Sequence, residues 1–264
     1  MSFEQRRDEG TSFTRADTEH LSYELRRADS GSWQVILRGP TASAVAGRLS
    51  YITRLRDLSV SAEAVTARIL SDRYHDVDRF LRFASEAYPV PGEVAEVWAF
   101  HPHSPEEGRS EWSGLLRRAK PRRGTGDLGA ARQLGRHMAR VMRLHPGIRR
   151  AEAIVPVPDE TKKRPYSLPY ILAEMIADIL DIPLVPSLVR KAQSTPEAKK
   201  LSPIERRIML AGSFVVSSES PRRVVVVDDV VETGATLDAI ARSLRANGTA
   251  TVCVAAAYRG HASR

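Results

Sequence analysis

Thirteen residues from Val224 to Thr236 (VVVVDDVVETGAT) constrain the fold more than any other part of the chain. Four consecutive valines predict a strand buried on both faces, as in a parallel sheet covered by helices on either side. Asp228 and Asp229 follow where this strand should end, and a turn then leads into a helix. The apolar stripe expected for that helix consists of Leu237, Ile240, Ala241 and Leu244.

The turn after the two acids has the chemistry of a phosphate site. In open α/β sheets, ligands bind at the carboxyl ends of the strands. A helix that begins there offers unpaired N–H groups and a partial positive charge. Thr233 and Thr236 add hydroxyl donors, and Gly234 lets the backbone approach a ligand closely. Because paired carboxylates can accept hydrogen bonds from two vicinal hydroxyls, the segment predicts a site for a sugar that carries a phosphate.

Two other interpretations of this segment stay open. A hydrophobic run followed by two aspartates can hold Mg²⁺ in a nucleotidase, but the chain contains no G-x-x-x-x-G-K-[ST] motif. The segment can also be a purely structural strand, turn and helix with incidental acids.

The composition is that of a globular protein, with 42% hydrophobic and 27% charged residues. No apolar stretch approaches the roughly 20 residues that span a bilayer, and no secretory signal is visible, so we expect a cytoplasmic protein without membrane contact. The single cysteine, Cys253, excludes an internal disulfide. The net charge of +8 suits nucleic acid and a pyrophosphate substrate equally well, and no motif supports nucleic acid.

The chain is expected to divide into two parts near the cluster Tyr88-Pro-Val-Pro-Gly92. For residues 1–95 we predict a small, mainly helical region, with helices over residues 41–58 and 62–87 and a strand over residues 32–37. For residues 96–264, strands that alternate with helices predict an α/β domain with a mostly parallel sheet flanked by helices. The polar stretch from Arg190 to Arg207 is predicted to be a long loop.

A second informative segment is the strand Ile154 to Pro158 (IVPVP), which ends at a basic turn. This turn would place Lys162, Lys163 and Arg164 at the carboxyl edge of the sheet, where they could stabilise a leaving pyrophosphate. The alternative is a solvated basic turn, which is what charged runs often are. The basic run from Arg117 to Arg123, which includes Lys120, is likewise interpreted as solvated surface.

The segment Val224 to Thr236 resembles the 5-phosphoribosyl 1-pyrophosphate (PRPP) signature of type I phosphoribosyltransferases. From Glu111 onward, the order of motifs resembles the ComF-like branch of this superfamily, which is related to amidophosphoribosyltransferases. The pieces that carry this resemblance are Lys120, Asp127 to Arg143, Ile154 to Pro158, Arg164, Ser194-Thr195, Glu205-Arg206, Gly212 to Val216 and the signature itself. They cover roughly the last 165 residues.

The resemblance implies a phosphoribosyltransferase-like protein that binds PRPP and Mg²⁺, transfers the phosphoribosyl group to a nitrogen nucleophile and releases pyrophosphate. Asp228 and Asp229 would hold the ribose hydroxyls and are the candidate metal ligands. Lys199 and Arg206, in the long loop, are candidates to close over the pyrophosphate. The substrate-binding residues implied are Val231, Glu232, Thr233, Gly234, Ala235, Thr236, Lys162, Lys163 and Arg164.

The chain departs from the ComF-like pattern in two places. It lacks the paired CxxC motifs of a zinc ribbon, so no structural zinc is implied. Its basic loop reads Arg164-Pro165-Tyr166, and proline removes an N–H donor where the family usually has glycine. These departures favour an alternative function, a non-catalytic PRPP-sensing or regulatory protein, including a ComF-like role in DNA uptake or handling. The acceptor carries no signature in the sequence, and a homodimer is a candidate assembly.

Overall fold

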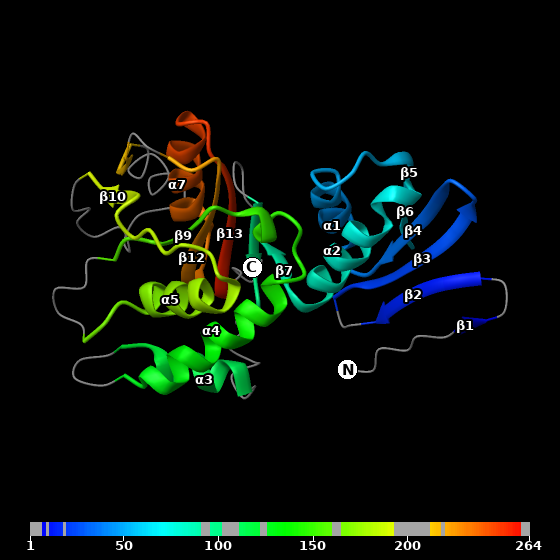
Figure 1. Cartoon of the computed structure of the whole chain (residues 1–264). Coiled ribbons are helices and arrows are strands. Elements are labelled where there is room, and N and C mark those ends of the chain that lie inside the picture. Colours follow the sequence, from blue (N-terminus) through cyan, green and yellow to red (C-terminus); the bar gives the residue numbers. More distant parts are fainter. Residues whose placement is uncertain are drawn as a thin grey trace. The chain divides into compact units, whose positions relative to one another are not determined.

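The structure is a computed structural model. It describes residues 7–8, 11–17, 20–90, 96–101, 111–121, 126–159, 165–192, 212–217 and 220–259. The chain forms two compact units, one of residues 1–89 with 144–147, the other of residues 90–143 with 148–264 (Figure 1). The division expected at residue 95 falls in the stretch 91–95, which lies outside the described residues.

The first unit is built on a six-stranded sheet in the order β1-β2-β3-β4-β6-β5, with antiparallel neighbours throughout. Its strands are β1 (Arg7–Asp8), β2 (Thr11–Asp17), β3 (Ser22–Asp29), β4 (Ser32–Arg38), β5 (Arg56–Val60) and β6 (Val65–Leu70). Its helices are α1 (Ala42–Leu49), the short 3₁₀ helix η1 (Ser71–Arg73) and α2 (Tyr74–Glu86). Its core includes Tyr23, Leu25, Val35, Phe80 and Phe83.

The prediction that this region is mainly helical is wrong, because the sheet is its main element. Residues 65–70, predicted as part of one long helix, form β6, whose buried residues alternate with more exposed ones as a strand requires. The helix predicted over residues 41–58 ends at Leu49, and Arg56–Val60 forms β5. Strand β3 was not predicted, since its buried Tyr23 and Leu25 lie among charged residues.

The second unit has the predicted mostly parallel sheet. Strands β8 (Glu96–Ala99), β13 (Ala250–Tyr258), β12 (Arg223–Val231) and β9 (Ala153–Pro156) are neighbours in that order, and all three pairings are parallel. Short strand β7 (Tyr88–Val90) is the fifth strand of this sheet and lies next to β8. A separate antiparallel pair joins β10 (Val189–Lys191) to β11 (Phe214–Val216). The four consecutive valines of β12, Val224 to Val227, are buried, as the sequence predicts for a central strand.

Helices cover both faces of this sheet, because parallel neighbours need right-handed crossovers. The path from β12 through α7 (Ala235–Ala246) to β13 runs one way along the sheet. The path from β8 to β9 runs the other way, through α3 (Glu111–Ala119), α4 (Leu128–Met142) and the 3₁₀ helix η2 (Ile148–Arg150). Helix α5 (Leu168–Leu180) follows β9 and packs against α4 and β12. The group α3, α4 and α5 therefore lies opposite α7 (Figure 1).

Local signals place the ends of these helices. Asp127 caps α4 by accepting a hydrogen bond from the Ala130 N–H (2.9 Å). Gly234 adopts φ +75° at the start of α7, a conformation that favours glycine. No helix in the described part of the chain combines the length and the apolar character that crossing a membrane requires.

Candidate functional site

The candidate site begins where β12 loses one of its two neighbours. The pairing of β12 with β9 ends at Val227, whose carbonyl accepts the Val157 N–H (2.9 Å). The pairing with β13 continues to Val231 opposite Tyr258. Strand β12 thus extends four residues beyond the end predicted from the sequence. From Asp228 onward, one flank of the strand is therefore without its β9 partner, which leaves room for a ligand at the carboxyl end of the sheet.

Asp228 and Asp229 lie at this point and are both partly exposed. Each carboxylate accepts a hydrogen bond from the next backbone N–H: Asp228 Oδ1 from Asp229, and Asp229 Oδ1 from Val230, both at 2.8 Å. Burial, followed by repulsion from the Asp229 carboxylate, raises the pKa of Asp228 well above that of an ordinary aspartate. A hydrogen-bond donor or a cation supplied by a ligand would relieve this unfavourable charge.

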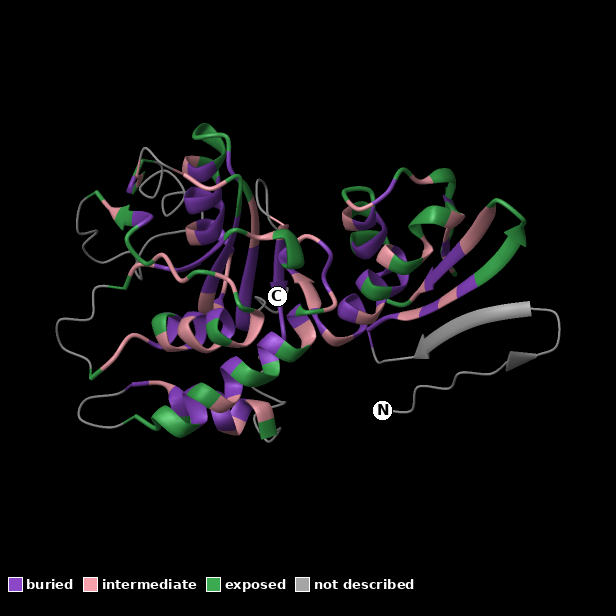
Figure 2. Ribbon diagram, viewed as in Figure 1, coloured by how far each residue is buried: buried purple, intermediate pink, exposed green. Residues whose placement is uncertain are grey.

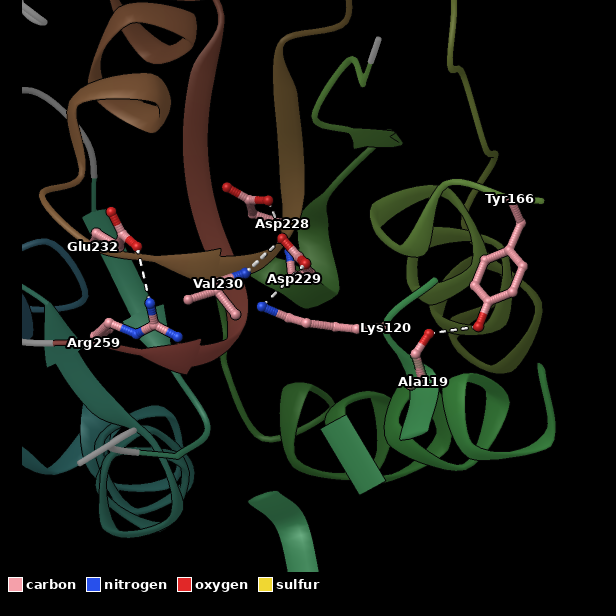
Figure 3. A network of polar contacts seen from close by, with 8 residues as sticks. All are labelled: Ala119, Lys120, Tyr166, Asp228, Asp229, Val230, Glu232 and Arg259. Atoms are coloured by element: carbon pink, nitrogen blue, oxygen red, sulfur yellow. Dashed lines mark hydrogen bonds and ion pairs between the residues drawn. The ribbon is translucent and has the colours of Figure 1, made fainter. Parts of the chain in front are cut away.

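The two acids point to different neighbours, because successive side chains of a strand alternate between faces. Asp228 lines a small pocket of about 110 Å³ at the turn between β12 and α7. Asp229 instead extends toward Lys120, whose Nζ lies 3.8 Å from its Oδ2 (Figure 3). The pair is about one-third exposed on the lysine side, so solvent weakens its Coulomb interaction.

The pocket beside Asp228 is formed by the turn that the sequence singled out. Its lining consists of Asp228, Val230, Val231, Glu232, Thr233, Gly234, Ala235, Thr236 and Leu237. The Thr233 Oγ1 accepts a long hydrogen bond from the Ala235 N–H (3.4 Å), and the Gly234 carbonyl accepts the Asp238 N–H (2.8 Å). Ala235, Thr236 and Leu237, at the start of α7, line this small pocket, and a helix N-terminus is a favourable place for a phosphate.

Two cations, Lys120 and Arg259, flank the site, and the sequence analysis did not place either of them there. Lys120 follows α3, so the interpretation of its basic run as solvated surface is wrong for this residue. Arg259 follows β13, and its Nη1 lies 3.4 Å from Oε1 of Glu232 (Figure 3). Its backbone N–H donates to the Val231 carbonyl (2.9 Å). Arg259 could have been found from the sequence, since it directly follows a predicted parallel strand.

Contacts from three elements hold Lys120 beside the sheet. The Trp112 indole N–H of α3 donates to the Ala256 carbonyl of β13 (2.9 Å). The Tyr166 hydroxyl, just before α5, donates to the Ala119 carbonyl (Figure 3). Gly126 lies so close to the Tyr166 ring that an added Cβ would come within 2.8 Å of it. Tyr166, from the unusual Arg-Pro-Tyr sequence, therefore helps to fix the end of α3.

The remaining predicted site residues, Lys162, Lys163, Arg164, Lys199 and Arg206, lie outside the described residues. The described residues contain no group of three or more His, Cys, Asp or Glu that could hold a metal ion. His101, just after β8, has its Nε2 3.1 Å from Ser113 Oγ of α3.

Comparison with known proteins points to one family. Residues 169–264 match the phosphoribosyl transferase domain. Competence protein F of Haemophilus influenzae is 36% identical over 110 residues, which are 39% of this chain and 48% of that protein. The match thus spans about half the length of this curated relative.

Solved structures of lower similarity include two enzymes. The glutamine phosphoribosylpyrophosphate amidotransferase of B. subtilis is 16% identical, with a TM-score of 0.36 over 89% of this chain and 47% of that one. The adenine phosphoribosyltransferase of Leishmania tarentolae is 18% identical, with a TM-score of 0.35 over 60% of this chain and 76% of that one.

Proposed function

Since this chain belongs to the type I phosphoribosyltransferase superfamily and is ComF-like, we propose that it binds PRPP with Mg²⁺ and transfers the phosphoribosyl group to a nitrogen nucleophile. The observation that carries the proposal is the phosphate-sized pocket at the start of α7 with Asp228 in its lining. In the proposed reaction, the bond from the ribose C1 to the pyrophosphate oxygen breaks as the nitrogen bonds to C1. The nitrogen then loses a proton to solvent.

Each part of the site has a role in this proposal. The N–H groups of residues 235–237 and the Thr233 and Thr236 hydroxyls would bind the 5′-phosphate. Asp228 would accept a hydrogen bond from one ribose hydroxyl, and Asp229 from the other. Positioning and charge neutralisation would supply most of the reduction in the barrier, so no acid–base residue is required of this part of the site.

The residues present fit a magnesium ion that enters with the substrate. Mg²⁺ is typically held by one or two carboxylates together with phosphate oxygens of a substrate, and Asp228 and Asp229 supply two carboxylates. When bound, the ion would neutralise charge on the leaving pyrophosphate. Lys162, Lys163, Arg164, Lys199 and Arg206 remain our proposed additional cations for that group.

Calorimetric titration with PRPP and Mg²⁺ tests the binding step. Heat of binding at micromolar PRPP supports the proposal, and folded protein that gives no heat at high micromolar PRPP would refute it. Pyrophosphate release, measured with a panel of bases and amines, tests the transfer step.

A second candidate is a PRPP-binding regulatory protein without turnover, including a ComF-like role in DNA uptake or handling. It is favoured by Pro165 in the basic loop, where a phosphate-binding backbone would use N–H donors. Binding of PRPP with no pyrophosphate release from any acceptor of the panel would support this candidate over the enzyme.

Lys120→Met is predicted to weaken PRPP binding about tenfold, which corresponds to about 1.4 kcal/mol. The substitution removes the cation that lies 3.8 Å from Asp229. The negative charges of Asp228 and Asp229 are then no longer compensated by Lys120, and they repel an anionic ligand more strongly. Titration calorimetry gives the affinity. Arg117→Met removes the same charge from an exposed position of α3 and should change the affinity less than about twofold. Equal losses in the two variants would contradict a local role for Lys120.

Arg259→Met is predicted to weaken phosphate binding roughly fivefold, because it leaves the Glu232 carboxylate uncompensated in the lining of an anion pocket. If charge compensation is the reason, the double variant Glu232→Gln/Arg259→Met should regain most of the lost affinity. Competition of ribose 5-phosphate with labelled PRPP measures the phosphate affinity of the single and the double variant. A double variant that binds as weakly as Arg259→Met would instead indicate direct contact between Arg259 and the ligand.

A further inference from the structure

The positive charge of the chain is concentrated in one segment. Residues 111–150 contain eleven Lys and Arg but only two acids, Glu111 and Asp127, and so carry a charge of +9, whereas the whole chain carries +8. The other residues together are almost neutral, although they too are rich in arginine. The excess is therefore a property of α3, α4, η2 and their connections, and not of the composition as a whole.

Helix α4 presents part of this charge as a regular row. Arg132, Arg136 and Arg140 are exposed and follow one another at four-residue spacing. They therefore lie along one side of the helix at intervals of about 6 Å. The buried side, with Ala131, Leu134 and Met138, packs in the second unit. Figure 2 shows exposed positions recurring along α4 between buried ones.

The row is not balanced by acids within the described residues. Helix α4 has no acidic residue, and no described carboxylate forms an ion pair with Arg132, Arg136 or Arg140. By contrast, the exposed face of the first unit pairs Arg38 with Glu24 (3.0 Å). Like charges four residues apart on a helix repel one another, so the charges of the row cost stability.

We propose that α4 binds the phosphodiester backbone of a nucleic acid along the row Arg132, Arg136 and Arg140. A linear array of cations matches a linear polyanion, and the guanidinium fork can donate two hydrogen bonds to one phosphate. An anionic membrane surface fits less well, because a membrane-binding helix also exposes large apolar side chains. In α4, Leu128 at the N-terminal end is the large apolar residue that is exposed. Contacts to phosphates alone would make the binding insensitive to base sequence.

The row on α4 shares no residue with the proposed PRPP pocket, whose lining residues all belong to β12, α7 and the turn between them. The row contains no aromatic side chain, so the proposed binding does not involve stacking of single-stranded bases.

Fluorescence anisotropy with the full chain tests the proposal. A labelled mixed-sequence single strand, the corresponding duplex and an RNA of the same sequence are titrated at several salt concentrations. At low salt, Arg132→Gln/Arg136→Gln/Arg140→Gln should weaken binding to at least one of them tenfold or more. It should also lower the slope of log K against log[salt] by about two to three, as expected for three lost phosphate contacts. Arg132→Lys/Arg136→Lys/Arg140→Lys retains the charges and should keep most of that slope.

A matched control variant distinguishes an effect of the row on α4 from an effect of the net charge of the protein. Arg190→Gln/Arg222→Gln/Arg242→Gln removes three other exposed arginines and the same net charge. It should bind nucleic acid within about twofold of the unmodified protein. Equal weakening of both Gln triples, or no nucleic-acid binding by the unmodified protein at low salt, overturns the proposal. Binding of polyglutamate in preference to all three nucleic acids would also overturn it and point to an acidic protein. Thermal melting of each variant confirms that it is folded.

Discussion

Asp228→Asn is expected to weaken PRPP binding about a hundredfold and to raise the thermal midpoint of the free protein. The loss of affinity follows from removing a charged acceptor in the lining of the pocket, since a hydrogen bond to a charged group contributes up to about 3 kcal/mol. The gain in stability follows from the raised pKa of Asp228, because its ionised form is disfavoured by burial and by Asp229. An asparagine keeps the Oδ1 that accepts the Asp229 N–H.

The raised pKa also fixes the sign of a pH effect. Between the ordinary pKa of an aspartate and the raised pKa of Asp228, the folded protein holds a proton that the unfolded chain releases. The free energy of unfolding contributed by this group therefore falls as pH rises through that window. Thermal melts of the unmodified protein and Asp228→Asn across pH should converge at the acidic end and separate as pH rises.

Asp178→Asn provides the control for both effects. Asp178 is an exposed acid on α5, so its replacement changes the net charge equally but leaves the pocket intact. It should change the PRPP affinity by less than about twofold. It should change the pH dependence of the free energy of unfolding by no more than about a few tenths of a kcal/mol. If Asp228→Asn retains the affinity of the unmodified protein, Asp228 does not bind the sugar. A lower thermal midpoint would show that its charge is stabilising.

The part of the site that could be predicted from the sequence is the part that is contiguous in the sequence. Strand β12, the turn and α7 each carry local signals: a run of valines, two acids, and hydroxyls around Gly234. Their arrangement follows from chain connectivity, because a strand that enters a helix through a short turn places the N-terminus of that helix at the end of the strand.

The rest of the site depends on tertiary packing that local patterns do not specify. Lys120 lies more than one hundred residues before Asp229, and it reaches that acid because Trp112 and Tyr166 anchor the two ends of α3. In the sequence it is one of several cations in a polar run. The first unit was mispredicted for a related reason, since six residues of strand joined to a helix can imitate one longer, irregular helix.

Gly135→Leu is expected to destabilise the second unit by about 3 kcal/mol or more and to reduce PRPP binding through loss of folded protein. Gly135 lies where α4 crosses α5, and even a Cβ there would come within 2.7 Å of Met175 Cβ and 3.5 Å of the Leu172 carbonyl oxygen. A larger side chain must force the two helices apart. Helix α5 packs on β9 and β12, so the displacement would be transmitted to the strand that carries both acids.

Gly135→Ala and Gly114→Ala test this reasoning against intrinsic helix propensity. Alanine favours a helix by about 1 kcal/mol relative to glycine, so both substitutions should stabilise if propensity alone mattered. At Gly114 in α3, an added Cβ meets nothing within 4 Å, and we expect the thermal midpoint to rise. At Gly135 the contact with Met175 opposes the propensity, and we expect the midpoint to fall. Urea unfolding of the three variants measures the difference. Equal stabilisation by both alanines would mean that α4 and α5 are not packed as closely as their backbones indicate, and Lys120 would then lose the support that this helix group gives it.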